Sequence, residues 1–240
     1  MNTPEEVYRE FFRADSAQDA QAWADVMSYP HVRVSGDGRV HYFETAADYA
    51  ASASWTEREA TGWVRSEGIE PERVHASADM VHLAGGWTRY NAGGDPILEN
   101  RVAYLLTRLD GSWGIQARFA CGATPTWRGV DDAGPEHTVR QYCQALEDAD
   151  RDRCARLVRY PLTIVGVGTV RRLEDAAAFG RAFGTLAGGA PSAVRVVANG
   201  SAGATVAATS GNDPEGRIHT LFLVAKHAAA CRIVAMSTLP

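Results

Sequence analysis

Three side chains in the N-terminal half have the types and spacing that proton transfer requires. His31 and Arg33 alternate along one predicted strand, and Arg118 lies on the last predicted strand of that half. Histidine accepts a proton near neutral pH, and guanidinium groups stabilise negative charge that develops on an oxygen. We therefore predict His31 as the catalytic proton-transfer group, with Arg33 and Arg118 as catalytic groups that stabilise an enolate or carboxylate oxygen.

A second set of side chains is predicted to bind the substrate. Gln116 and Arg118 are two residues apart, so a regular strand would present both on one face. Tyr29 could donate a hydroxyl hydrogen bond, and large aromatic side chains could form apolar walls. The predicted substrate-binding residues are Tyr29, Gln116, Trp55, Trp63, Trp87 and Tyr104. The competing interpretation is structural, with the polar groups on a solvated face and the aromatic groups in a core.

The sequence contains no metal or cofactor motif. Its seven histidines lack the paired spacing of a zinc site, and it has neither a Gly-rich phosphate loop nor a nucleophile elbow. The four cysteines have no metal-type or redox-type spacing, which predicts buried free thiols. We expect chemistry that uses no metal and no cofactor.

Composition narrows the class of partner. The chain has 24 basic and 29 acidic residues and a formal charge of −5, so it lacks the basic field that nucleic-acid binding needs. No apolar run approaches the roughly 18 residues that span a bilayer, and the opening MNTPEEVYRE is acidic. We expect a cytoplasmic protein that binds a small-molecule ligand and neither nucleic acid nor membrane.

The elements that must position these residues occur twice. At a constant offset, a series of positions near the start recurs in the second half. The pairs are Pro4 and Pro135, Glu5 and Glu136, Arg9 and Arg140, Ala14 and Ala145, Asp19 and Asp150, Ala24 and Ala155, Tyr29 and Tyr160, Pro30 and Pro161, and Val34 and Val165. This repeat predicts one domain over residues 1–122, a Pro-, Gly- and Asp-rich linker over 123–134, and a second copy over 135–240.

Each copy is predicted to contain two helices, a hairpin, a third helix and three long antiparallel strands. Thr3 and Glu6 form a capping box for the first helix, and Asp19 caps the second. Tyr-Pro is predicted to end the second helix. The hairpin should pair Val34 with Val40 across a three-residue loop. The predicted segments of the first copy are hairpin strands 31–35 and 39–43, helix 45–55 and strands 73–91, 99–109 and 112–120.

This order of elements, with the closing motif Asp110-Gly111-x-Trp113-x-Ile115, resembles the nuclear transport factor 2-like superfamily. Stretches 29–33 and 113–118 are most similar to SnoaL-like bacterial proteins. The resemblance implies an α+β fold of two tandem cone-shaped domains, each with three helices packed on a curved, mainly antiparallel sheet. It also implies activities that range from isomerase, cyclase and dehydratase (a lyase) to hydrolase, as well as non-catalytic carriers. Where members similar to ketosteroid isomerase carry a carboxylate base, this chain has none.

The second copy lacks the polar groups of the first. In place of His31, Arg33, Gln116 and Arg118 it has Leu162, Ile164, Val234 and Met236. We therefore predict that the first copy is active, that the second is structural or degenerate, and that the halves pack as an intramolecular pseudo-dimer, with further oligomerisation left open.

The function expected from these residues is a cofactor-independent enzyme of bacterial metabolism. It would act on a small, partly apolar organic molecule by acid/base chemistry, as an isomerase, cyclase, lyase or hydrolase. The alternatives are a non-catalytic small-molecule binding protein and a pseudo-dimeric interaction scaffold.

Overall fold

A computed structural model describes residues 3–123, 134–211, 216–227 and 230–239 of the chain. The first half contains α1 (Pro4–Ser16), α2 (Ala20–Asp25), β1 (Met27–Ser35), β2 (Val40–Phe43), α3 (Ala46–Ala51), α4 (Thr56–Glu59), β3 (Trp63–Gly68), β4 (Glu72–Ala76), β5 (Met80–Asn91), β6 (Pro96–Leu109) and β7 (Ser112–Ala120). The second half contains α5 (Pro135–Glu147), α6 (Arg151–Leu157), β8 (Val158–Gly166), β9 (Thr169–Leu173), α7 (Ala176–Ala182), the 3-10 turn η1 (Phe183–Thr185), β10 (Pro191–Asn199), β11 (Gly203–Ser210), β12 (Ile218–His227) and β13 (Ala230–Leu239).

The two halves have the same strand order. The first sheet runs β2-β1-β7-β6-β5-β3, with β4 also on β5, and the second runs β9-β8-β13-β12-β11-β10. In each sheet the first hairpin strand is parallel to the last strand, and the other pairs are antiparallel. This confirms the predicted fold of two tandem α+β domains with mainly antiparallel sheets. Most of the predicted linker, residues 124–133, lies outside the described residues.

The helix caps and the hairpin register predicted from the sequence are present in the structure. Thr3 and Glu6 make both hydrogen bonds of the capping box on α1, and Asp19 and Asp150 cap α2 and α6. The hairpin register is confirmed, with Val34 opposite Val40. All four cysteines are buried, and none is in a disulfide bond with another.

Three predicted segments were wrong in detail. Residues 73–91 form two antiparallel strands, β4 and β5, because the chain turns at residues 77–79, where the Ser77 N–H bonds the Met80 carbonyl at 2.8 Å. Segment 45–55 forms α3 and leads into a separate α4. The two Tyr-Pro pairs lie inside β1 and β8, and the preceding helices end earlier. Strand β3 was missed because its residues lack an alternating apolar pattern.

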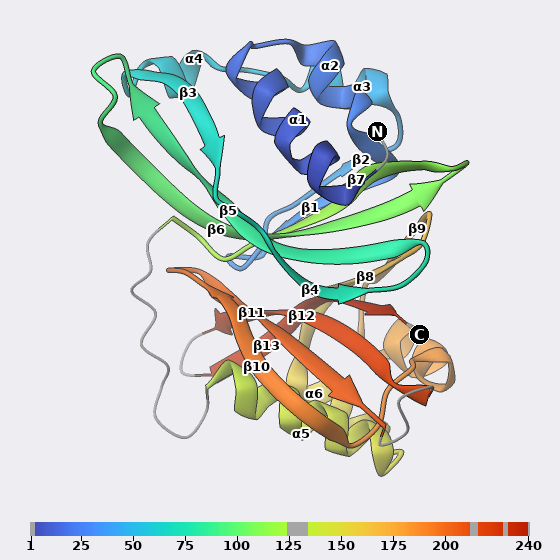
Figure 1. Cartoon of the computed structure of the whole chain (residues 1–240). Helices are drawn as coiled ribbons and strands as arrows, with labels where there is room; N and C mark the ends of the chain where they lie inside the picture. The colour runs from blue at the N-terminus through green and yellow to red at the C-terminus, as the bar shows by residue number, and fades with distance from the viewer. Residues whose placement is uncertain (1–2, 124–133, 212–215, 228–229, 240) are drawn as a thin grey trace.

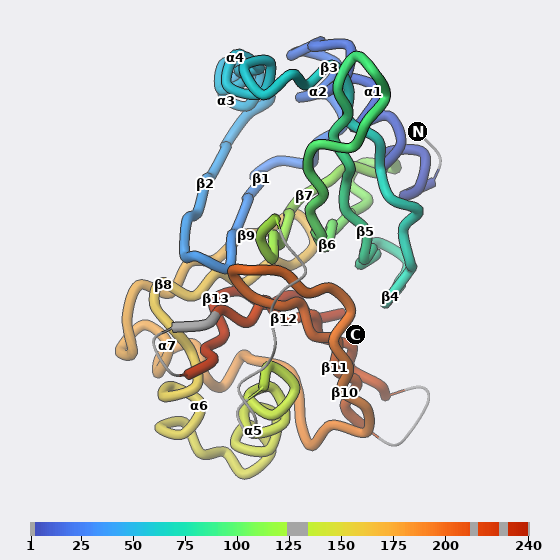
Figure 2. Tube along the Cα trace, turned by 90° about the vertical axis from the view of Figure 1, so that its left-hand side faces the viewer, coloured from blue at the N-terminus to red at the C-terminus, as the bar shows by residue number. Residues whose placement is uncertain are grey.

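The molecule is built in four layers (Figure 1). The helices of each half cover the outer face of its own sheet, and the two sheets face each other, which Figure 2 shows from the side. Side chains from both sheets form one buried cluster between them, here called the inter-sheet core: Val32, Val34, Met80, Ala103, Leu105, Ala117, Phe119, Cys121, Val165, Ala198, Ala207, Leu221, Leu223, Ala225, Val234, Ala235 and Leu239. The halves therefore share a core in addition to the one that each encloses beneath its helices.

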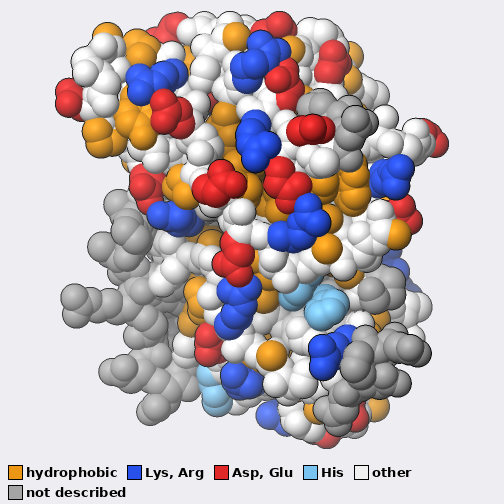
Figure 3. Space-filling model, viewed as in Figure 1, with side chains coloured by type: hydrophobic (Ala, Val, Ile, Leu, Met, Phe, Trp, Pro, Cys, Tyr) orange, Lys and Arg blue, Asp and Glu red, His pale blue; other side chains and the backbone are white. Residues whose placement is uncertain are grey.

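The exterior carries charges of both signs. Acidic and basic side chains alternate over the face seen in Figure 3, and neither sign forms an extended field there. None of the described helices combines the length and apolar character needed to cross a bilayer.

Candidate functional site

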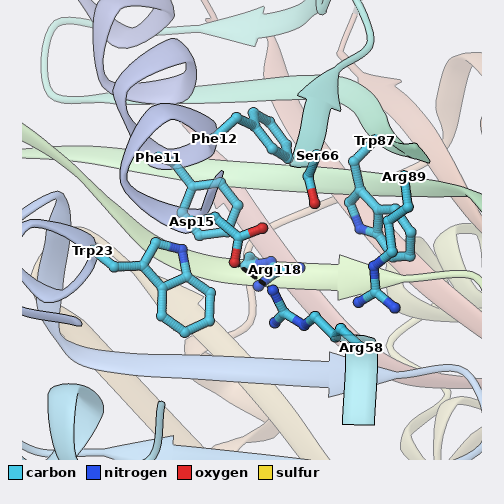
Figure 4. A pocket seen from close by; sticks show the side chains of 9 residues that line it. All are labelled: Phe11, Phe12, Asp15, Trp23, Arg58, Ser66, Trp87, Arg89 and Arg118. Atoms are coloured by element: carbon cyan, nitrogen blue, oxygen red, sulfur yellow. Dashed lines mark hydrogen bonds and ion pairs between the residues drawn. The ribbon is translucent and has the colours of Figure 1, made fainter. Parts of the chain in front are cut away.

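A small polar cavity lies inside the first domain, between α1 and the sheet. Its volume is about 40 Å³, which is room for a few water molecules or one carboxylate group. Figure 4 shows Asp15 from α1, Arg58 from α4 and Arg118 from β7 pointing toward one another. The lining residues are Phe11, Phe12, Asp15, Trp23, Arg58, Ser66, Trp87, Arg89 and Arg118.

Four arginines, here called the arginine cluster, lie at or beside this cavity. Arg58, Arg89 and Arg118 line it, and the Arg33 guanidinium lies 5.0 Å from the ring centre of the lining residue Trp23. The Arg118 guanidinium lies 5.0 Å from the centre of the Phe11 ring, and the Arg33 guanidinium lies 4.5 Å from that of Tyr49. The Nε atoms of Arg33 and Arg118, and Nη2 of Arg33, are buried without a hydrogen-bond partner among the described residues. Aromatic faces thus hold these two cations in place while some of their donors stay free.

One carboxylate, Asp15, lines the cavity. Its residue is 4% exposed, and Oδ1 accepts hydrogen bonds from Arg58 Nη1 and, at 3.3 Å, from Trp55 Nε1. Burial lowers the pKa of Arg89 to about 10, with Arg58 adding to the effect. Burial also lowers the pKa of Arg33. Guanidinium groups keep their charge at neutral pH under shifts of this size, so the arginine cluster is cationic around a single carboxylate.

His31 is fully buried beside this cluster. Its Nδ1 lies 2.8 Å from the Ile115 carbonyl oxygen, which can only accept, so Nδ1 carries the proton and Nε2 has the lone pair. Nε2 has no partner among the described residues. Burial, followed by the charges of Arg33 and Arg118, lowers the pKa of His31 well below its ordinary value. The ring is therefore a neutral base at pH 7.

His31 does not line the cavity. The Tyr49 ring packs edge-on against the imidazole at 5.1 Å between ring centroids. The Tyr49 hydroxyl is buried, lacks hydrogen-bond geometry to any described group, and lies near enough to Arg33 and Arg118 to favour their charged forms. Tyr49 thus contacts the His31 ring and lies near Arg118, although neither Tyr49 nor His31 lines the cavity.

The predicted aromatic residues differ in how close they lie to the cavity. Trp87 lines the cavity, and Tyr104 lies under the Arg118 guanidinium at 5.5 Å. Trp55 bonds Asp15, whereas Trp63 Nε1 donates to Ser66 Oγ at 3.0 Å and contacts the Arg58 guanidinium. Tyr29 lies at the edge, and its hydroxyl donates to the Ala24 carbonyl at 2.8 Å, so it already has a structural acceptor.

The prediction that Gln116 and Arg118 share a strand face was wrong. Leu106 pairs with Ile115 and Leu105 with Ala117, so Gln116 is the extra residue of a β-bulge. The bulge turns Gln116 away from the cavity, and its Oε1 accepts a hydrogen bond from Gly168 N of the second domain at 3.0 Å. Gln116 therefore belongs to the contact between the halves.

Sequence reasoning missed Asp15, Arg58 and Arg89. A signal for Asp15 was present, because it continues the buried stripe of α1 that includes Phe11 and Phe12, where an acid is unusual. At the corresponding position the second copy has Leu146, which packs against that domain's core. Arg58 lies in the short helix α4 and Arg89 near the end of β5, and only the fold brings them to the cavity.

The second domain has apolar groups at the equivalent positions. Leu162, Ile164 and Met236 all belong to its core or pack against it. The Tyr142 hydroxyl contacts the Met236 sulfur at 3.8 Å, where the first domain has Phe11 and Arg118. The cationic interior is thus a property of the first domain and is not required by the shared fold. Among the described residues, no cluster of three or more His, Cys, Asp or Glu side chains could hold a metal ion.

Comparison with known proteins gives similarities of fold. No protein family and no curated protein matches the sequence. An NTF-2-like protein of unknown function from Shewanella oneidensis MR-1 aligns with 48% of this chain and 93% of its own, at 13% identity and a TM-score of 0.40. Aln2 from a Streptomyces species aligns with 49% of this chain and 91% of its own, at 16% identity and a TM-score of 0.40.

A third solved structure is a hypothetical protein with a ketosteroid isomerase-like fold from Catenulispora acidiphila DSM 44928, in complex with trimethylamine. It aligns with 49% of this chain and 85% of its own, at 13% identity and a TM-score of 0.34. Each of these neighbours matches about half of the chain, and none identifies a reaction for it.

Proposed function

We propose that the first domain is a cofactor-independent enzyme that moves a proton on a small, partly apolar organic molecule. The observation that carries this proposal is the state of His31, a buried neutral imidazole with a free Nε2 beside two guanidinium groups. A base within reach of a substrate and cations that stabilise an oxyanion are the two groups that enolisation needs.

In this mechanism, Nε2 of His31 removes a proton from a carbon next to a carbonyl group. The electron pair of the broken C–H bond moves to the carbonyl oxygen, where Arg118 and Arg33 stabilise the negative charge. The imidazolium then returns the proton to another atom of the enolate, which gives an isomerised product. A lowered pKa makes the protonated His31 a strong acid for this second step.

Access to His31 requires side chains to move. His31 is fully buried and does not line the cavity, so a substrate that touches both His31 and Arg118 must displace groups packed around the imidazole, among them the Tyr49 ring. In this proposal the second domain is the built-in partner of a pseudo-dimer, supported by the inter-sheet core. A cytoplasmic location stays a prediction from the sequence.

His31→Leu should reduce proton exchange by at least about 100-fold while the fold persists. The measurement is deuterium incorporation by mass spectrometry into a panel of small enolisable oxo acids and ketones incubated with the protein in D2O. Folding should survive because Leu162 occupies the equivalent buried position in the second domain.

His41→Leu is the matched control, since His41 is exposed on the neighbouring strand β2. It should exchange as the wild type does. Wild-type exchange that persists in folded His31→Leu would refute the assignment of the base. A panel member that binds the protein without any exchange would favour the alternative, a non-catalytic binding protein. One structural observation already supports that alternative, because His31 does not line the cavity.

A further inference from the structure

The interior of the first domain holds more positive than negative charge. Three guanidinium groups, those of Arg58, Arg89 and Arg118, line the cavity together with one carboxylate, Asp15, which already bonds Arg58. Buried charges without partners are costly, and proteins normally pair or neutralise them. Arg118 has no ion pair with any described residue, and its Nε has no hydrogen-bond partner among them, so a guanidinium donor stays open beside the cavity.

The free donors have a geometry that suits a planar anion. A guanidinium group is a flat fork that binds a carboxylate through two parallel hydrogen bonds. Three arginines on three different elements line the cavity: Arg118 on β7, Arg58 on α4 and Arg89 on β5 (Figure 4). The remaining walls are the aromatic side chains of Phe11, Phe12, Trp23 and Trp87, which favour an apolar substituent on the anion.

We propose that this cavity binds the carboxylate group of a small, partly apolar organic acid, with Arg118 as its principal partner and Arg58 and Arg89 beside it. This inference rests on the proposed function and names its substrate class. The cavity of about 40 Å³ accommodates the carboxylate group alone, so the aromatic side chains that line it must move apart to admit the rest of the acid. Guanidinium forks bind carboxylate and phosphate groups alike, so it is the volume of the cavity, about 40 Å³, that favours the smaller carboxylate group.

The test is calorimetric titration with benzoate and with its uncharged counterpart benzamide, followed by acetate, propionate and inorganic phosphate. Benzoate should bind the wild-type protein at least about 10-fold more tightly than benzamide, since a charged hydrogen bond contributes the difference. Arg118→Met should weaken benzoate binding by about 10- to 100-fold. Arg108→Met, the same change at an exposed position on the adjacent strand β6, should bind benzoate as the wild type does.

Met236 occupies the equivalent place in the second domain, so Arg118→Met should fold, and Arg89→Met serves as a second variant. The inference is overturned if none of the three acids binds, if benzamide or phosphate binds as tightly as benzoate, or if folded Arg118→Met retains full affinity. Failure of the proposed function has a different signature. In that case benzoate would bind through Arg118, but no compound of the D2O panel would exchange its protons. Conversely, if only neutral ketones showed exchange that depends on His31, the proposed function would stand and the carboxylate site would be overturned.

Discussion

Replacing Phe119 with alanine should lower the free energy of unfolding of the whole chain by about 3–5 kcal/mol. Phe119 is fully buried in the inter-sheet core, where it lies among apolar side chains of both domains, including Leu221. Removing the ring leaves a cavity between two sheets whose backbones are held together, for instance by the 2.8 Å hydrogen bond from Ala202 N to the Cys121 carbonyl. The surroundings can therefore collapse only in part.

The same experiment tests whether the halves unfold as one unit. The tryptophans lie at positions 23, 55, 63, 87, 113 and 127, all before the second copy, so fluorescence reports the first half while far-ultraviolet circular dichroism reports both. Chemical denaturation followed by both signals should give coincident transitions, each shifted equally by Phe119→Ala. Val64→Ala, at a side chain 45% exposed on β3, should change stability by less than about 0.5 kcal/mol. Separate transitions for the two signals would contradict a shared folding unit.

Sequence patterns correctly predicted the features that depend on residues close together in the chain. The capping box of Thr3 and the hairpin register of Val34 with Val40 depend on residues close in the chain, and both were correct. The bulge at Gln116 was not predictable in this way, because it depends on how β6 and β7 pair. The second domain has a register shift at the same place, between Leu223 and Val224, which puts Val234 in the inter-sheet core. The bulge is thus a feature of the repeated fold.

The candidate site was predicted in part. His31, Arg33 and Arg118 were predicted from their side-chain chemistry and their positions on strands. The second copy has apolar residues at the same positions, so folding alone does not need polar groups there. The competing interpretation placed these polar side chains on a solvated strand face. The structure contradicts it, because His31 and the Nε atoms of both arginines are buried. Arg58 comes from a short helix with no repeat partner, so nothing in the sequence connects it with Asp15.

Three histidines, two of them buried, lie together where the two domains meet. His75 from β4 and His82 from β5 approach at 3.2 Å between their Nδ1 atoms, and His82 Nε2 lies 3.0 Å from Ser237 Oγ of β13. The Ser237 hydroxyl donates to the Met80 sulfur, so His82 Nε2 must carry the proton and His82 Nδ1 must accept one from His75. The ring of His219 from β12 lies 4.9 Å from that of His75. This network is complete when the histidines are neutral.

Protonation of this network is opposed from several sides. Burial, then the neighbouring His219 and Arg195 of β10, lowers the pKa of His75 to about 4. Burial and the two neighbouring histidines lower the pKa of His82 well below its ordinary value, and burial with Arg217 lowers that of His219. The nearby carboxylate, Glu72 of β4, is paired with Arg195 at 2.5 Å. No carboxylate is among the groups that shift the pKa values of these three histidines.

The free energy of unfolding should therefore fall as the pH is lowered from about 6.5 to about 4. In this window an unfolded histidine binds a proton and a folded one with a depressed pKa does not, so acid favours the unfolded chain. His75 alone should contribute about 3 kcal/mol to this loss, from a pKa near 6.5 unfolded and about 4 folded. The measurement is chemical denaturation at half-unit pH steps. His75→Gln should flatten the curve by about that amount, whereas His137→Gln, at an exposed position on α5, should keep the wild-type slope. Equal slopes for all three proteins would show that the histidines between the sheets do not couple folding to pH.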